Sequence, residues 1–177
     1  MKKVVLLTIF AALMMISSAA VAQTTASGTL SVTANVTGSI NLVFNSDASG
    51  LALSSGAGTN AATLAFGNVS AFGPISAGIV RSTTATTFTV SSAVDVLVTK
   101  TNSASANYKL TAQLGSADAV NTWSVGGVAV TNTAAAQITA TGTYAANSNF
   151  PVAITVPFTT ASGTLISNTI NYVATAN

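Results

Sequence analysis

Few side chains in this 177-residue sequence could perform acid–base or nucleophilic chemistry. It contains no His and no Cys, and its three acidic residues are Asp47, Asp95 and Asp118. A Ser-His-Asp or Cys-His arrangement is therefore impossible, and neither a disulfide nor a thiolate metal site can form. Two Asp residues acting together, as in some glycosidases and proteases, are the one catalytic arrangement that the composition leaves open. We predict a protein that is not an enzyme, with no catalytic residue, metal or cofactor.

Two of the acidic residues suggest weak alternatives. Asn45 to Gly50 has oxygen-bearing side chains at alternate positions and a Gly at the sixth, as in calcium loops, but no acidic residue closes the loop. An Asx turn at Asp47 is the prediction, with weak calcium binding as the alternative. Asp95 is expected on a solvent-facing strand surface, paired with Lys100 or another cross-strand base, and a Lys–Asn isopeptide link is the alternative.

The aromatic residues Trp123, Tyr108, Tyr144 and Tyr172 could form a sugar-binding platform. Each lies in an alternating apolar pattern, however, and packing in a core explains such positions more simply. We predict that they are core residues.

The first 22 residues have the features of a secretory leader. Lys2 and Lys3 precede an apolar run from Val4 to Met15, and Ala20-Val21-Ala22 is a small-x-small cleavage site before Gln23. The apolar run is too short for a retained membrane span. We therefore predict an exported chain that passes through the periplasm, is secreted to the cell exterior and has no membrane span once the leader is removed.

Removal of the leader leaves a chain without net charge. Arg81, Lys100 and Lys109 then balance the three Asp residues, and the rest of the polar surface is Thr, Ser and Asn. This chain offers no basic patch for nucleic acid. A domain with a net charge near zero tends to associate with other molecules.

Side-chain alternation dominates the chain after the leader. In the stretch from Ser27 to Val36, apolar residues occupy the even positions from Leu30 onward and polar residues the odd ones, which predicts a strand with one dry face. Similar short runs recur at roughly ten-residue spacing, separated by Gly, Asn and Ser. Their apolar positions include Ile40 to Phe44, Leu64 and Phe66, Phe88 to Val98, Tyr108 to Leu114, Trp123 to Val130, Ile138 to Tyr144, Val152 to Val156 and Ile170 to Ala174.

This spacing predicts an all-β fold. We expect an antiparallel, immunoglobulin-like β-sandwich of about ten short strands with Greek-key connections. Gly126-Gly127 is expected to form a tight hairpin, and the Ala-rich stretch 133–137 one helical turn at most. The predicted organisation is a signal peptide (1–22), an N-terminal strand (23–37) and one sandwich domain (38–177).

The sequence resembles the spore-coat-U-like and archaic chaperone-usher pilin group of bacterial secreted domains. The residues that carry the likeness are Leu30 to Val36, Leu64-Ala65-Phe66-Gly67, Ser105 to Leu110, and the closing segment from Gly163 that contains Ile170-Asn171-Tyr172. In this group an incomplete sandwich accepts the N-terminal strand of a neighbouring subunit, which is called donor-strand complementation.

The resemblance implies roles for particular residues and partners. The donor strand would be Thr24 to Val36, with Leu30, Val32, Ala34 and Val36 as its apolar plugs, and the acceptor groove would include Ile166, Ile170 and Tyr172. The partners implied are other copies of the chain in a head-to-tail polymer, with a periplasmic chaperone and an outer-membrane usher. We expect a structural subunit of a fimbria or similar surface fibre. The alternative is a self-contained secreted sandwich that binds carbohydrate or a surface protein.

Overall fold

The computed structural model describes residues 27–177. The predicted leader and the first residues of the predicted donor strand lie outside this range. The chain divides after Asn35 into two units, and the folded unit is Val36–Asn177. No helix within residues 27–177 is long and apolar enough to cross a membrane.

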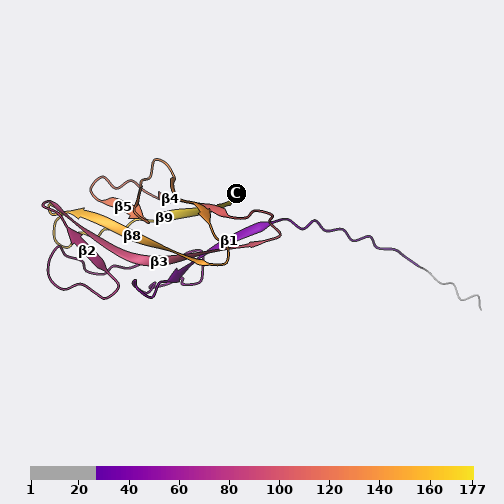
Figure 1. Ribbon diagram of the computed structural model, residues 1–177, viewed down its shortest axis with the longest axis horizontal. Coiled ribbons are helices and arrows are strands. Elements are labelled where there is room, and N and C mark those ends of the chain that lie inside the picture. Colours follow the sequence, from indigo (N-terminus) through magenta and orange to yellow (C-terminus); the bar gives the residue numbers. More distant parts are fainter. Residues whose placement is uncertain (1–26) are drawn as a thin grey trace, which may run out of the picture. The chain divides into compact units, whose positions relative to one another are not determined.

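Nine strands form the folded unit (Figure 1). They are β1 (Ser39–Ser46), β2 (Val80–Thr83), β3 (Thr87–Thr101), β4 (Tyr108–Leu114), β5 (Thr122–Val125), β6 (Val128–Val130), β7 (Ala136–Gly142), β8 (Asn147–Pro157) and β9 (Ile170–Ala176).

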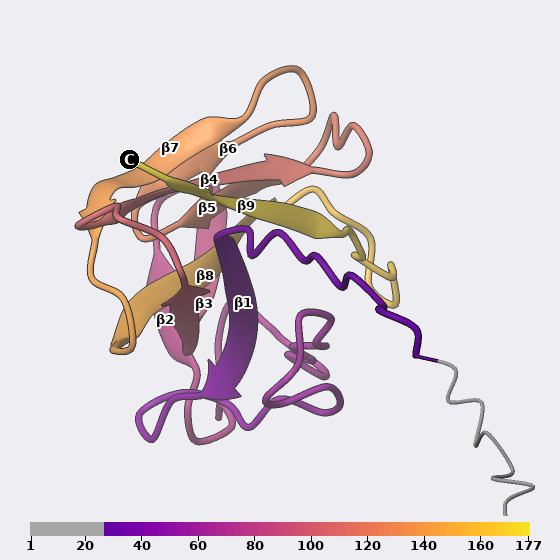
Figure 2. The ribbon, with the colours of Figure 1, turned by 90° about the vertical axis from the view of Figure 1, so that its right-hand side faces the viewer.

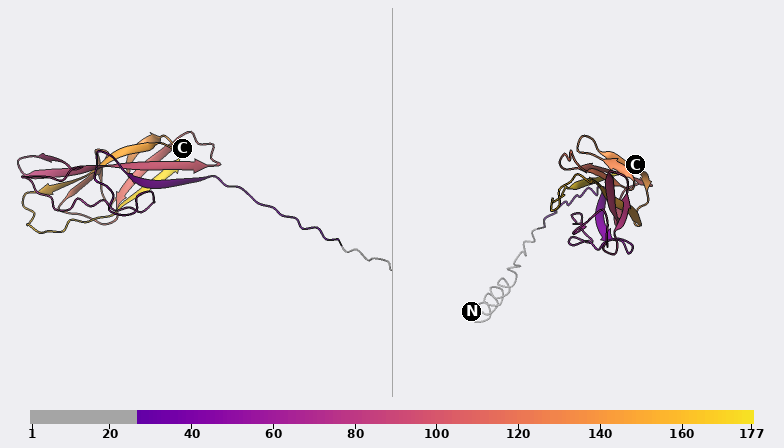
Figure 3. Two further views of the ribbon diagram at one scale, coloured as in Figure 1. Left: turned by 90° about the horizontal axis from the view of Figure 1, so that it is seen from below. Right: turned by 90° about the vertical axis from the view of Figure 1, so that its left-hand side faces the viewer.

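The strands form two antiparallel sheets. The larger has the order β1-β3-β8-β5-β6, with β2 also paired to β3, and the smaller has the order β7-β4-β9. Figure 2 shows β7, β4 and β9 of the smaller sheet above β1, β3 and β8 of the larger one, and in Figure 1 the long strands β3 and β8 run the length of the sandwich; Figure 3 gives two further views. The predicted antiparallel β-sandwich is confirmed, with nine strands in place of about ten.

The core follows from the alternation of side chains along the strands. In β3 the even-numbered residues from Phe88 to Val98 are buried, and in β4 the even-numbered residues from Tyr108 to Leu114 are buried on the facing sheet. Because side chains of a strand alternate between its faces, each sheet has one apolar inner surface. The largest fully buried apolar side chains are Val90, Val96, Val98, Tyr108, Leu110 and Val125.

Several details differ from the sequence-based predictions. Residues 27–38 belong to no strand, and the predicted strand at Leu64 and Phe66 is an extended segment with one isolated bridge nearby, Ser55 to Thr63. The Ala-rich stretch leads into β7 instead of forming a helical turn. The Gly126-Gly127 hairpin between β5 and β6 is confirmed. Alternation records which face of a segment is dry, but it does not record whether a pairing partner exists in the same chain.

Gly142 is required by the close packing of Tyr108. A Cβ atom at Gly142 would lie 2.2 Å from the Tyr108 ring, which is fully buried. Overpacking of this kind costs about 1–3 kcal/mol, so we expect Gly142→Ala to lower the free energy of unfolding in urea by about that amount. Gly115→Ala, whose nearest new contact would be 3.3 Å, is the milder comparison. Equal stability of the two variants would contradict this account of the core.

Candidate functional site

A large apolar groove opens into the sandwich. Its volume is about 1900 Å³, and its floor is the inner face of the larger sheet. The floor residues come from β3, β5 and β8 and are Phe88, Val90, Val94, Trp123, Val152, Ile154 and Val156. All seven floor residues belong to the buried core and are at most 9% exposed, so the wall segments already cover much of the floor in the single chain.

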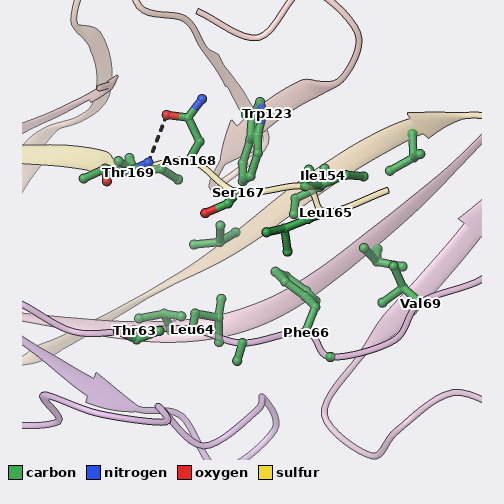
Figure 4. Close-up of a pocket in the computed structure, with 18 of the residues that line it drawn as sticks. Thr63, Leu64, Phe66, Val69, Trp123, Ile154, Leu165, Ser167, Asn168 and Thr169 are labelled. Carbon is green, nitrogen blue, oxygen red and sulfur yellow. Dashed lines mark hydrogen bonds between the residues drawn. The ribbon is translucent and has the colours of Figure 1, made fainter. Parts of the chain in front are cut away.

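Two extended segments form the walls of the groove. Leu64, Phe66 and Val69 lie on one wall, whereas Leu165 and Ser167 lie on the other (Figure 4). Neither wall segment is part of a named strand. Between 62 and 66 the even-numbered residues are partly buried and the odd-numbered ones are exposed, so this wall turns its apolar face inward.

The groove lies between two sheet edges, of which the β1 edge is paired at Phe44, where Phe44 N donates to Thr59 O at 2.9 Å and Gly58 N donates to Phe44 O at 2.7 Å. Strand β1 is at the edge of the larger sheet and β9 at the edge of the smaller one, and both line the groove. They approach each other where the Phe44 and Tyr172 rings meet edge to face, with centroids 5.1 Å apart. An open edge presents unpaired N–H and C=O groups, which an additional strand can satisfy.

The register identifies the backbone groups on the open side of β9. Gly115 N donates to Thr169 O at 2.7 Å, and this pair continues the β4–β9 ladder. Because hydrogen-bonded pairs alternate in an antiparallel ladder, the odd-numbered residues of β9 bond to β4. The N–H and C=O groups of Ile170, Tyr172 and Ala174 therefore face the open edge, and their side chains face the interior.

The predicted acceptor residues line this groove. Ile166 lies on the wall segment before β9, and Ile170 and Tyr172 lie on β9 itself. All three are partly buried. Burial raises the pKa of the Tyr172 hydroxyl above its ordinary value, so this side chain is neutral in the physiological range.

The predicted donor plugs are exposed. The exposed fractions are 88% for Leu30, 80% for Val32 and 77% for Val36, and Ala34 is exposed as well. No residue between 27 and 38 belongs to a strand. None of these four side chains belongs to the core clusters of the described residues.

Comparisons with known proteins give no relative from which the role of the groove could be inferred. No family model, curated protein or solved structure matches this chain.

One end of the groove is aromatic. The centroid of the Phe158 ring lies 6.0 Å from that of Phe72 and 6.4 Å from that of Phe88. Phe72 is 72% exposed. Arg81 fixes the loop that carries Phe72, because its guanidinium donates to the Ser70 and Gly73 carbonyl oxygens at 2.9 and 2.8 Å. The exposed aromatic pair is therefore continuous with the groove and is held in place.

The remaining polar candidates do not form a site. Asp47 accepts hydrogen bonds from Ser49 N and Oγ, which confirms the Asx turn, and these bonds lower the Asp47 pKa. Asp95 accepts from Asn147 and Asn149 instead of pairing with Lys100, so that expectation is wrong. The Lys100 ammonium lies over the Tyr144 ring instead. No group of three or more metal-ligating acidic, His or Cys side chains occurs in the part of the chain that the structure describes.

The aromatic residues predicted to be core residues are placed accordingly. Tyr108 is fully buried, Trp123 is 7% exposed, and Tyr144 and Tyr172 pack against the core. Trp123 also lines the groove, a role that its sequence context did not indicate, because groove lining depends on how distant segments pack over its strand.

Asp118 holds the Trp123 side chain. Trp123 Nε1 donates to Asp118 Oδ2 at 2.8 Å. Partial burial acts to raise the Asp118 pKa, but hydrogen bonds from Asn121, Trp123 and Val120 outweigh it and lower the pKa to about 2.

The low pKa of Asp118 predicts that the environment of Trp123 in the groove does not change in mild acid. A carboxyl group whose pKa is lower in the folded than in the unfolded state stabilises the folded state at pH values above its unfolded pKa. This contribution is lost as the pH falls through the pKa of the folded state. We expect the fluorescence of Trp123, the single Trp of the chain, to be constant from neutral pH to about pH 3 and to change as the pH approaches about 2. A transition centred at about pH 4, the ordinary carboxyl range, would contradict this environment for Asp118.

Proposed function

We propose that this protein is a structural subunit of an extracellular fimbria or similar surface fibre, and that it assembles by donor-strand complementation. In this proposal the segment from Thr24 to Val36 of one copy fills the groove of the next copy. The observation that carries the proposal is the apolar groove between two sheet edges, β1 and β9, of which the β9 edge is open.

The chemistry of the donor segment matches the groove. An added strand needs one apolar face for the floor and a regular backbone for the edge. The apolar face of the donor segment consists of Leu30, Val32, Ala34 and Val36. At the open edge of β9, the added strand can pair with the backbone N–H and C=O groups of Ile170, Tyr172 and Ala174. Burial of a large aliphatic side chain contributes about 1.5–3 kcal/mol, and the ladder hydrogen bonds add to this.

A second copy is the proposed occupant because the donor segment is not a strand of its own sandwich. The alternative, a self-contained sandwich, would place the first strand in its own sheet, but residues 27–38 lie in no sheet. The exposed aromatic pair, Phe72 and Phe158, which the alternative would use for ligand binding, belongs to the same groove.

The chain enters the sandwich at one end of strand β3, and the aromatic end of the groove lies near the other end, which favours a linear polymer. The chain enters the sandwich at Ser39, which pairs with Thr101 at the end of β3, whereas the aromatic end of the groove is at Phe88, near the start of β3. The two lie about 40 Å apart along the strand. A contact that repeats between opposite ends of identical subunits is heterologous and produces an open filament.

The proposed location and partners follow from the leader and the groove. Export through the periplasm leaves an open apolar groove that needs protection before assembly, and a periplasmic chaperone with an outer-membrane usher would provide it. The nearly uncharged surface of the mature chain suits close contact between copies.

The experiment that tests the function compares residues 23–177 with a variant that lacks residues 23–37. Size-exclusion chromatography and negative-stain microscopy should show filaments for the first and folded monomers for the second, because the deletion removes no strand of the sandwich. A full chain that stays monomeric, together with a deletion variant that unfolds, would overturn the proposal and favour the self-contained sandwich.

A further inference from the structure

The loop between β4 and β5 carries a carboxylate with no spare acceptor position. Asp118 Oδ1 accepts from the backbone N–H groups of Val120 and Asn121 at 3.0 and 2.8 Å. Its other oxygen, Oδ2, accepts from Trp123 Nε1 at 2.8 Å and from Asn121 Nδ2 at 3.0 Å. Both oxygens are therefore committed to donors within the same turn.

One of these donors belongs to the groove. The Trp123 indole lines the groove and is 7% exposed, so its single N–H cannot turn to bulk water. An indole offers one donor and no acceptor, and an ionised carboxylate offers acceptors only. The bond to Asp118 therefore selects one orientation of the ring among those that the space would permit.

The loop between β4 and β5 is also hydrogen-bonded to the wall segment that precedes β9. Ser116 N and Oγ donate to Asn168 Oδ1 at 3.3 and 3.2 Å, and Asn168 Nδ2 donates to the Ser116 carbonyl at 3.0 Å. Asn168 lines the groove just before β9. The loop thus connects the floor at Trp123 with the wall that leads into the open edge.

We propose that Asp118 is a positioning residue of the groove, which fixes the Trp123 ring and thereby the shape that the groove offers to the donor strand of a second copy. This inference rests on the proposed function. It assigns to Asp118 a role in assembly that is separate from its contribution to the stability of the subunit.

The test uses two matched substitutions in the mature chain, residues 23–177. Asp118→Asn replaces one acceptor oxygen by an NH₂ donor, which must face either the indole N–H or the backbone N–H groups. Asp47→Asn is the control, since Asp47 also caps a turn but accepts its hydrogen bonds from Ser49, which does not line the groove. Sedimentation gives the critical concentration for filament assembly, urea unfolding gives the stability, and Trp123 emission reports the ring.

We expect Asp118→Asn to raise the critical concentration at least tenfold and to shift Trp123 emission, and Asp47→Asn to leave both within twofold of the wild type. A role through Trp123 is isolated by a double-mutant cycle. Trp123→Phe keeps an aromatic ring but removes the N–H, so Asp118→Asn in that background should add less than a twofold change in critical concentration.

The outcomes separate this inference from the proposed function. Assembly of Asp118→Asn at the wild-type concentration overturns the inference alone, and so does an effect of equal size in the Trp123→Phe background, which would mean a general structural role. Failure of the wild-type chain to form filaments at any concentration overturns the proposed function and the inference together.

Discussion

Replacement of Val32 by Asp is expected to abolish filament formation by the mature chain. In the proposed filament Val32 is a central plug in an apolar groove, and a carboxylate there would be buried without a partner. Such burial costs about 3–5 kcal/mol, which corresponds to a loss of affinity of roughly 100-fold or more. The measurement is the fraction of protein that sediments as filament over a range of concentrations.

The free subunit should tolerate this change. Val32 is 80% exposed in the single chain and lies in no strand, so the thermal unfolding of the monomer should be unaffected. Thr33→Asp places the same charge one residue further along, on the opposite face of an extended segment, and is the matched control. Equal loss of assembly in the two variants would mean that net charge governs association and that the plug face has no special role.

A peptide of residues 24–36 is expected to stabilise the variant that lacks residues 23–37. A ligand that binds only the folded state stabilises it by about 2.7 kcal/mol at 100 times its dissociation constant. For a domain of this size that is a rise in Tm of about 8 °C. The physical cause is the burial of four apolar side chains on the groove floor together with the completion of the open edge of β9.

The matched control for this experiment is the same peptide with Val32→Asp. It has the same length and backbone, so it should produce no rise in Tm at the same concentration. A rise with both peptides would indicate non-specific association with apolar surface. No rise with either would mean that the groove does not accept this segment.

Most of the fold could be predicted from the sequence because its signal is local. Alternation of apolar and polar residues marks a strand independently of its partners, so β4, β8, β9 and the Gly126-Gly127 hairpin agree with the predictions. The even-numbered apolar positions of β3 were also predicted, but β3 is one strand of 15 residues where short strands were expected. Strand number and boundaries depend on pairing, which is a property of the whole chain.

The two failures share one physical cause. Leu30 to Val36 and Leu64 to Phe66 both show clean alternation, and neither is paired in the single chain. Alternation shows that a segment can cover an apolar surface, and it carries no information on whether that surface lies in the same chain. Both segments are associated with the proposed complementation, the first as donor and the second as a wall of the groove.

The candidate site could be predicted only in part. Ile166, Ile170 and Tyr172 were assigned to a groove through the resemblance, and all three line it. Trp123 and the wall at Leu64 and Phe66 were missed as groove residues, since no local pattern indicates that β1 and β9 become sheet edges. The Asp118 bond to Trp123 spans only five residues, yet nothing in its composition distinguishes it from an ordinary Asx turn.

The most direct test of the central claim is a helical reconstruction of the filament by electron cryomicroscopy. Our account predicts an extended segment from one subunit in the groove of the next, with Leu30, Val32, Ala34 and Val36 facing the floor and a backbone ladder to Ile170, Tyr172 and Ala174. An occupied groove that contains the subunit's own N-terminal segment, or a subunit contact that leaves the groove empty, would contradict it.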